Sequence, residues 1–200
     1  MPVSLKELEL ELKQVLRPEQ FKDYCPNGLQ VEGRKEISKL VTGVTACQEL
    51  ITEAAEAGAD ALLVHHGYFW RGEDQSISGI KKTRIEALLK HDLSLFAYHL
   101  PLDVHREFGN NVQLGKVLGI EIDGEIGKQN NHPIGLTGTI DQGTDFDSLK
   151  ALIADKLDRQ PLAIEGNSRP IRSIAWCTGA AQNYIELAVA AGVDAYITGE

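Results

Sequence analysis

The feature that most constrains the fold is a strand–helix–strand pattern that occurs twice along the chain. In its first occurrence an apolar run over 39–44 precedes a helical pattern over 48–57, and Gly58 separates that helix from an apolar run over 60–65. Glycine is typical of the position just after a helix, and two extended segments joined by one short helix favour parallel strands. The sequence therefore predicts an α/β fold.

The second occurrence has the same order of elements and similar small residues at the end of its helix. Ala57-Gly58-Ala59-Asp60-Ala61 aligns with Ala191-Gly192-Val193-Asp194-Ala195. An internal repeat would give two similar α/β lobes, with parallel or mixed sheets flanked by helices. Small residues at helix ends are common in α/β proteins, so chance similarity stays open as the alternative. The second copy covers 172–177, 183–191 and 193–198.

The two lobes are predicted to divide near the segment over 123–133. Its Gly, Asn and Asp residues are typical of an exposed loop. We therefore assign 1–125 to an N-terminal lobe, and 126–200 to an inserted segment with the start of the second lobe. Further expected elements are helices over 110–118 and 147–157 and a strand over 135–140.

The second copy of the pattern ends earlier than the first. The first copy continues through a helix over 82–91 into another strand, whereas the second stops at Glu200. Domains normally finish in exposed segments and not at the tip of a core strand. We therefore expect the natural protein to continue with another helix and strand that carry further metal ligands.

Composition argues against several classes of protein. A net charge of −9 repels a phosphate backbone, so nucleic acid is an unlikely partner. No stretch is long and apolar enough to predict a membrane span. Cys25, Cys47 and Cys177 are an odd number of cysteines and lie far apart, which predicts reduced thiols in a cytoplasmic protein.

Histidines and an aspartate follow two of the apolar runs. His65 and His66 end one run, and a second run over 95–98 leads to His99 and Asp103. Consecutive side chains inside a strand point to opposite faces, but at a strand tip both become usable as ligands. Imidazole nitrogen together with carboxylate oxygen suits Zn, Mn, Fe or Co. The pattern predicts a metal site at the C-terminal ends of strands, with His65, His66 and Asp103 as ligands.

Each of these residues also has a simpler interpretation. A single histidine in a strand is more often a core residue than a ligand, although two in a row at a strand tip make both interpretations equally open. Asp103 follows Pro101 and either faces the strand ends or caps the next turn. His99 is a ligand, a partner that orients a ligand, or a proton carrier, and we favour the orienting partner.

Other motifs add little chemistry. The chain contains no phosphate-binding loop, no dinucleotide-binding glycine motif and no nucleophilic serine motif. Tyr68, Phe69 and Trp70 directly follow the histidine pair. They either stack on a flat ring of a ligand or serve packing or an oligomer contact.

Several separated motifs together resemble one protein family. The chain is similar to the YbgI-like branch of the NIF-three-like family, whose members are usually labelled GTP cyclohydrolase 1 type 2 homologues. The resemblance covers essentially the whole chain. The motifs that carry it, in order, are Pro26–Gly33, Val41–Ala46, Val64–Trp70 and His99–Asp103.

The resemblance implies two similar α/β lobes, a dinuclear metal centre in a cleft, and a toroidal homohexamer. It implies that His65, His66 and Asp103 are metal ligands. In the family the remaining ligands come from a C-terminal His-x-x-x-Glu motif, and no such motif occurs in this chain. The cofactors expected from the resemblance are two divalent metal ions of the Zn, Mn, Fe or Co class.

Two functional hypotheses follow. The first is a metal-dependent hydrolase that acts on a nucleotide-like or heterocyclic small molecule, because paired metal ions activate water and polarise the bond that it attacks. The second is a metal-binding oligomeric scaffold or regulatory protein without catalytic turnover.

Overall fold

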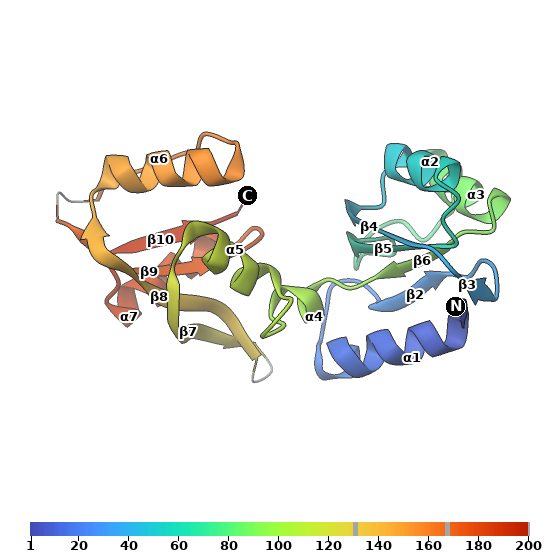
Figure 1. The fold of residues 1–200 in the computed structure, drawn as a ribbon, viewed down its shortest axis with the longest axis horizontal. Helices are drawn as coiled ribbons and strands as arrows, with labels where there is room; N and C mark the ends of the chain where they lie inside the picture. The colour runs from blue at the N-terminus through green and yellow to red at the C-terminus, as the bar shows by residue number, and fades with distance from the viewer. Residues whose placement is uncertain (130–131, 167–168, 200) are drawn as a thin grey trace. The chain divides into compact units, whose positions relative to one another are not determined.

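The computed structural model describes residues 1–129, 132–166 and 169–199, and Figure 1 shows its helices and strands. Packing divides the chain into two compact units, Met1–Leu102 and a second that begins at Asp103. This division lies earlier in the chain than the predicted lobe boundary after residue 125. Each unit has a four-stranded sheet with helices, which confirms the predicted α/β class. The relation of the units by an internal repeat stays a prediction.

The first unit is built on a mixed sheet with the strand order β2-β6-β5-β4. Strands β4, β5 and β6 are parallel, and β2 joins β6 antiparallel. A separate antiparallel pair is formed by β1 and β3. The strands are β1 (Val3–Ser4), β2 (Gly28–Val31), β3 (Glu36–Ile37), β4 (Leu40–Thr45), β5 (Ala61–His66) and β6 (Ser94–Ala97). The helices are α1 (Leu5–Leu16), α2 (Gln48–Glu56) and α3 (Gly79–Lys90), with a short 3-10 turn over Pro18–Gln20. Helix α4 (Leu100–Asp103) follows β6 and ends at the first residue of the second unit.

Helices cover both faces of this sheet (Figure 1). Alternate residues of β5 point to opposite faces, as in any strand. Leu62 and Val64 belong to the core under α2 and α3, while Ala61 and Leu63 pack with α1. Because both faces are covered, β5 is almost continuously apolar until it reaches its C-terminal residues.

Helix α1 begins with a capping box formed by Ser4 and Glu7. The Ser4 hydroxyl accepts a hydrogen bond from the Glu7 backbone N–H at 3.2 Å, and the Glu7 carboxylate accepts one from the Ser4 backbone N–H at 2.8 Å. This reciprocal cap satisfies two backbone donors that the first turn leaves without helical partners. The helix ends at Arg17, whose left-handed backbone precedes Pro18.

The second unit has the strand order β10-β9-β8-β7, with β9 and β10 parallel and the other pairs antiparallel. Helices α5 and α6 contribute to one core around the buried Trp176, and α7 to a smaller one. The strands are β7 (Glu121–Gln129), β8 (His132–Thr144), β9 (Ile171–Cys177) and β10 (Ala195–Thr198). The helices are α5 (Asn110–Leu118), α6 (Phe146–Leu157) and α7 (Ile185–Ala191), preceded by a 3-10 turn over Gln182–Tyr184.

The prediction of an exposed loop over 123–133 is wrong for 123–129 and 132–133, while 130–131 lie outside the described residues. Most of this segment is strand β7, which pairs antiparallel with β8 and buries Ile126. The pairing register shifts between Ile122 and Gly124, and a Cβ atom on Gly124 would lie 2.6 Å from the Thr137 hydroxyl oxygen. The glycine therefore permits a close approach of strands at an irregularity in the ladder.

Two further predictions concern the chain as a whole. All three cysteines are free thiols. Among the residues that the structure describes, no helix has the length and apolar character needed to cross a bilayer. Glu200, at which the second strand–helix–strand copy stops, lies outside the described residues.

Candidate metal site

Three histidines of the first unit meet at the C-terminal edge of its sheet. His65 and His66 are the last residues of β5, and His99 follows the end of the neighbouring parallel strand β6. The ring centroids lie 4.5 Å apart for His65 and His66, 5.0 Å for His65 and His99, and 5.7 Å for His66 and His99. One nitrogen from each ring lies within 4.8 Å of the others. We call these three residues the histidine cluster.

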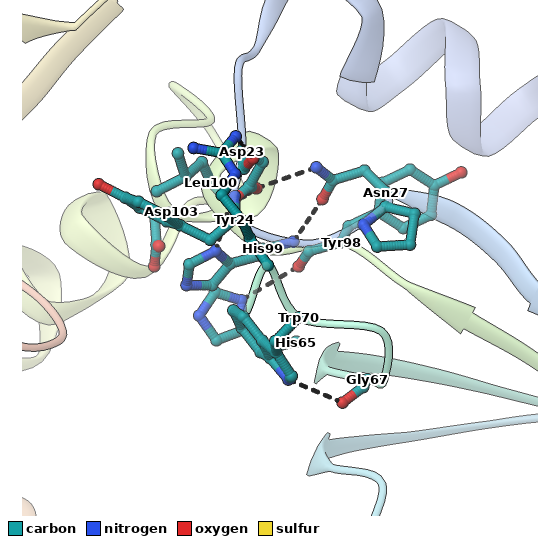
Figure 2. Close-up of polar contacts among 12 residues, drawn as sticks. Asp23, Tyr24, Asn27, His65, Gly67, Trp70, Tyr98, His99, Leu100 and Asp103 are labelled. Carbon is teal, nitrogen blue, oxygen red and sulfur yellow. Dashed lines mark hydrogen bonds and ion pairs between the residues drawn. The ribbon is translucent and has the colours of Figure 1, made fainter. Parts of the chain in front are cut away.

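Hydrogen bonds fix two of the rings through Nδ1. The His65 Nδ1 lies 3.0 Å from the Tyr98 carbonyl oxygen (Figure 2). A carbonyl oxygen only accepts, so Nδ1 of His65 is the donor and the lone pair of the neutral ring is on Nε2. The His66 Nδ1 lies 3.2 Å from the Thr45 hydroxyl oxygen, which either donates or accepts. Anchored imidazoles of this kind are typical of metal ligands.

A buried carboxylate, which the sequence did not mark, holds the third ring. The Asp23 side chain is only 2% exposed, and its Oδ1 lies 2.8 Å from His99 Nδ1. Oδ1 also accepts a bond from the Tyr24 backbone N–H at 2.6 Å. Oδ2 accepts bonds from the Asn27 side-chain amide and the Leu100 backbone N–H, each at 2.9 Å. Figure 2 shows these residues around His99.

The charge state of Asp23 follows from these contacts. Burial raises the pKa of a carboxyl group, but the hydrogen bonds from His99, Asn27, Leu100 and Tyr24 together outweigh it and lower the pKa of Asp23 below its ordinary value. The carboxylate is therefore ionised at neutral pH and acts only as an acceptor.

An aromatic side chain lies beside the cluster. The Trp70 ring centroid is 5.0 Å from that of His99 and 5.9 Å from that of His66. Its indole N–H donates to the Gly67 carbonyl oxygen at 3.2 Å (Figure 2). The preceding residue, Phe69, has a φ of 66°, which is uncommon for a bulky residue. The loop therefore adopts an unfavourable backbone conformation next to the cluster.

The three aromatic residues after the histidine pair have different surroundings. Tyr68 is buried, and its hydroxyl donates to the Ala46 carbonyl oxygen at 2.8 Å, so packing accounts for it. Phe69 is exposed, and the Lys81 ammonium nitrogen lies 5.2 Å from its ring centroid. Trp70 has ring contacts with His66 and His99 of the histidine cluster.

Asp103 belongs to the second unit, where its Oδ1 accepts hydrogen bonds from the Asn110 side chain at 2.8 Å and the Thr178 hydroxyl at 3.4 Å. These contacts orient the carboxylate within that unit. Its predicted role as a metal ligand rests on the sequence and stays a prediction.

Two groups of side chains in the first unit are close enough to hold a cation: the histidine cluster, and Asp23 with Cys25 and His99. The second group fits a cation poorly. Burial, with the nearby charge of Asp23, raises the pKa of the Cys25 thiol to about 12, so the thiolate that metals bind is scarce. The three imidazoles fit the borderline metals Zn, Fe and Co well.

The fold agrees with the comparisons to known proteins. The model of the Duf34/NIF3 family (NGG1p interacting factor 3) matches residues 3–200. The chain belongs to the Duf34/NIF3 family. This confirms the resemblance seen in the sequence, and it extends over almost the whole chain.

Individual proteins and a solved structure are also similar to this NIF3 protein. A Pseudomonas aeruginosa protein named GTP cyclohydrolase 1 type 2 homolog is 50% identical over all of this chain and 79% of its own length. An Escherichia coli K12 protein of the same name is 46% identical over 97% of this chain and 77% of its own length. The solved structure of a protein called ybgI, of unknown function, has a TM-score of 0.94 and 44% identity, covering 99% of this chain and 78% of that one.

Proposed function

We propose that this NIF3 protein binds two divalent metal ions and is a metal-dependent hydrolase of a nucleotide-like or heterocyclic small molecule. The observation that carries the proposal is the meeting of three imidazoles at the C-terminal ends of adjacent parallel strands, where α/β proteins place their ligands. The name of the relatives, GTP cyclohydrolase 1 type 2 homolog, favours a cyclohydrolase reaction.

The proposed ligands are His65, His66 and Asp103. His65 presents Nε2 because the Tyr98 carbonyl oxygen engages Nδ1. The inclusion of Asp103 rests on its place in the family motif. Bound ions of the Zn, Mn, Fe or Co class supply Lewis acidity, which lowers the pKa of water and polarises the bond under attack.

The substrate class follows from the reaction type and from one neighbouring side chain. Opening the imidazole ring of GTP is a hydrolysis at a ring carbon, and other heterocycles and cyclic amides undergo the same kind of step. Trp70, beside His66 and His99, is an aromatic side chain of the kind that packs against a flat ring. The net charge of −9 disfavours a triphosphate, so the screen extends beyond GTP.

The experiment compares wild-type protein with a His65→Ala, His66→Ala double variant after loading with Zn²⁺ or Mn²⁺. Elemental analysis gives the metal content, and chromatography follows the loss of GTP and of a panel of heterocycles and cyclic amides. We expect two ions per wild-type chain, and in the double variant a loss of most bound metal and of any turnover. Asp103→Asn in the same series measures whether that carboxylate is a ligand.

His91→Ala is the matched control, because His91 is an exposed histidine at the end of α3 in the same unit. It should retain full metal content. Equal metal content in wild-type protein and the double variant would contradict the metal site. Metal binding that depends on His65 and His66, without turnover of any tested compound, would instead favour the scaffold or regulatory hypothesis.

A homohexamer is the oligomeric state that the family resemblance implies, and we include it in the proposal. Sedimentation equilibrium should give about six times the 21.9 kDa mass of one chain. A monomer or dimer at micromolar concentration would contradict it.

A further inference from the structure

The Asp23 carboxylate has the geometry of an orienting group and not of a cation ligand. Its two oxygens accept four hydrogen bonds, from Tyr24, Asn27, His99 and Leu100. A carboxylate has about four lone-pair sites, so these donors account for its acceptor capacity. Direct binding of an ion by Asp23 would require the loss of at least one of these bonds in a buried place.

The same contacts determine which nitrogen of His99 carries a proton. N–H groups of Tyr24, Asn27 and Leu100 donate to both Asp23 oxygens, an environment that favours a carboxylate, so the hydrogen between His99 Nδ1 and Asp23 Oδ1 belongs to the imidazole. The lone pair of the neutral ring is then on Nε2. His65 has the same arrangement, with the Tyr98 carbonyl oxygen in place of the carboxylate. His65 and His99, whose ring centroids are 5.0 Å apart, thus each present an unprotonated Nε2.

The backbone that carries His99 is held by the same loop. The His99 backbone N–H donates to the Asn27 side-chain oxygen at 2.7 Å, and the Leu100 N–H donates to Asp23. Asn27 in turn donates to Asp23 at 2.9 Å. The segment between α1 and β2 therefore fixes both the position of the His99 backbone and the orientation of its ring.

We propose that His99 is a third nitrogen ligand of the metal site and that Asp23 is the positioning residue that presents His99 Nε2 to the ion. This inference rests on the metal site of the proposed function and adds to it a ligand and the group that orients that ligand. The ions concerned are borderline divalent cations such as Zn²⁺ and Co²⁺, which take imidazole nitrogen readily. The sequence favoured His99 as a partner that orients a metal ligand. In the structure Asp23 orients His99.

The arrangement is that of a carboxylate–histidine–metal group. In such groups the carboxylate fixes the ring and raises the basicity of its other nitrogen, and removal of the carboxylate typically weakens metal binding about 10- to 100-fold. Asparagine at position 23 can donate from its amide to His99 Nδ1, which moves the imidazole proton to Nε2. Asp23→Asn therefore keeps the size of the side chain and reverses the tautomer.

The test uses full-length Asp23→Asn and His99→Ala proteins together with wild type. Nitrogen-15 NMR of the metal-free proteins assigns the tautomer of His99. Co²⁺ titration gives the affinity and the ligand-field absorption spectrum, and competition gives the affinity for Zn²⁺. We expect the Nδ1–H tautomer in wild type and its loss in Asp23→Asn, with metal affinity about 10- to 100-fold weaker. His99→Ala should weaken binding and alter the Co²⁺ spectrum.

Asp60→Asn is the matched control. Asp60 is also a buried carboxylate of the first unit, and it also accepts backbone N–H bonds, but it precedes β5 at the opposite end from His65 and His66. It should leave Co²⁺ affinity, the Co²⁺ spectrum and the His99 tautomer unchanged. Equal losses of affinity in Asp60→Asn and Asp23→Asn would mean that general destabilisation is the cause, and would overturn the positioning role.

The outcomes separate this inference from the proposed function. Wild-type protein that binds neither Co²⁺ nor Zn²⁺ at the histidines defeats both. Wild-type protein that binds them through His65 and His66, with His99→Ala unchanged in affinity and spectrum, defeats only the inference. An Nε2–H tautomer of His99 in the metal-free wild-type protein also defeats it, and this measurement requires no variant to fold.

Discussion

The two parallel strand–helix–strand segments, β4–α2–β5 in the first unit and β9–α7–β10 in the second, share one arrangement at the start of their strands. Asp60 lies just before β5 and Asp194 just before β10, and each carboxylate accepts backbone N–H bonds from two residues at or near the start of the neighbouring strand. Each aspartate also donates its own N–H to that segment, to Lys39 and Ser173 respectively. The accepted donors are Ser38 and Lys39 for Asp60, and Arg172 and Ser173 for Asp194.

The opposite ends of these strands differ. Strand β5 ends in His65 and His66, whereas β10 ends in Ile197 and Thr198. The comparison teaches that the aspartate contacts to the neighbouring strand lie at the start of the strands in both units, while the histidine cluster of the first unit lies at the opposite end. The same aspartate hydrogen bonds at the start of the strands can therefore occur in two units whose strands end in different residues.

The comparison makes its largest stability prediction at the two aspartates. Asp60 is buried and paired with Arg34 at 2.8 Å, whereas Asp194 is exposed. Asp60→Ala should lower the stability of the first unit by about 2 kcal/mol, because hydrogen bonds to a buried charged group are lost. Asp194→Ala should cost the second unit about 1 kcal/mol, because water replaces the carboxylate. Hydrogen exchange measured by mass spectrometry resolves the opening of each unit.

Each variant serves as the control for the other, since the exchange rates of the unmutated unit should stay the same. A larger loss of stability for Asp194→Ala than for Asp60→Ala would contradict the expectation that the aspartate hydrogen bonds stabilise the first unit more than the second.

Local signals in the sequence were sufficient for most of the fold. The capping pair Ser4 and Glu7 marks the start of α1, and Gly58, Gly119 and Gly192 follow the ends of α2, α5 and α7. These signals work because the backbone of one or two residues decides where a helix begins or ends. Strand β7 was missed, because its glycine residues indicate a loop unless the pairing partner β8 is known.

The site was predictable only in part, for the same reason. His65, His66 and His99 were found because strand tips are visible as the ends of apolar runs. Asp23 was not, because it lies in an irregular segment 76 residues before its partner His99. Nothing in the residues around Asp23 identifies a contact over that separation, which depends on the way β2 adds to β6.

The last predicted effects, similar in size to that of Asp194→Ala, concern the glycines two residues before the two aspartates. Gly58 and Gly192 have φ values of 71° and 72°, and a Cβ atom at either would contact nothing within 4 Å. Alanine is therefore disfavoured only by its backbone conformation, at about 1 kcal/mol in each unit. Urea unfolding followed by circular dichroism should give equal losses for Gly58→Ala and Gly192→Ala. Gly166→Ala, at an open position without positive φ, should cause no loss of stability. A loss of stability in Gly166→Ala similar to that in Gly58→Ala and Gly192→Ala would contradict the explanation by backbone conformation.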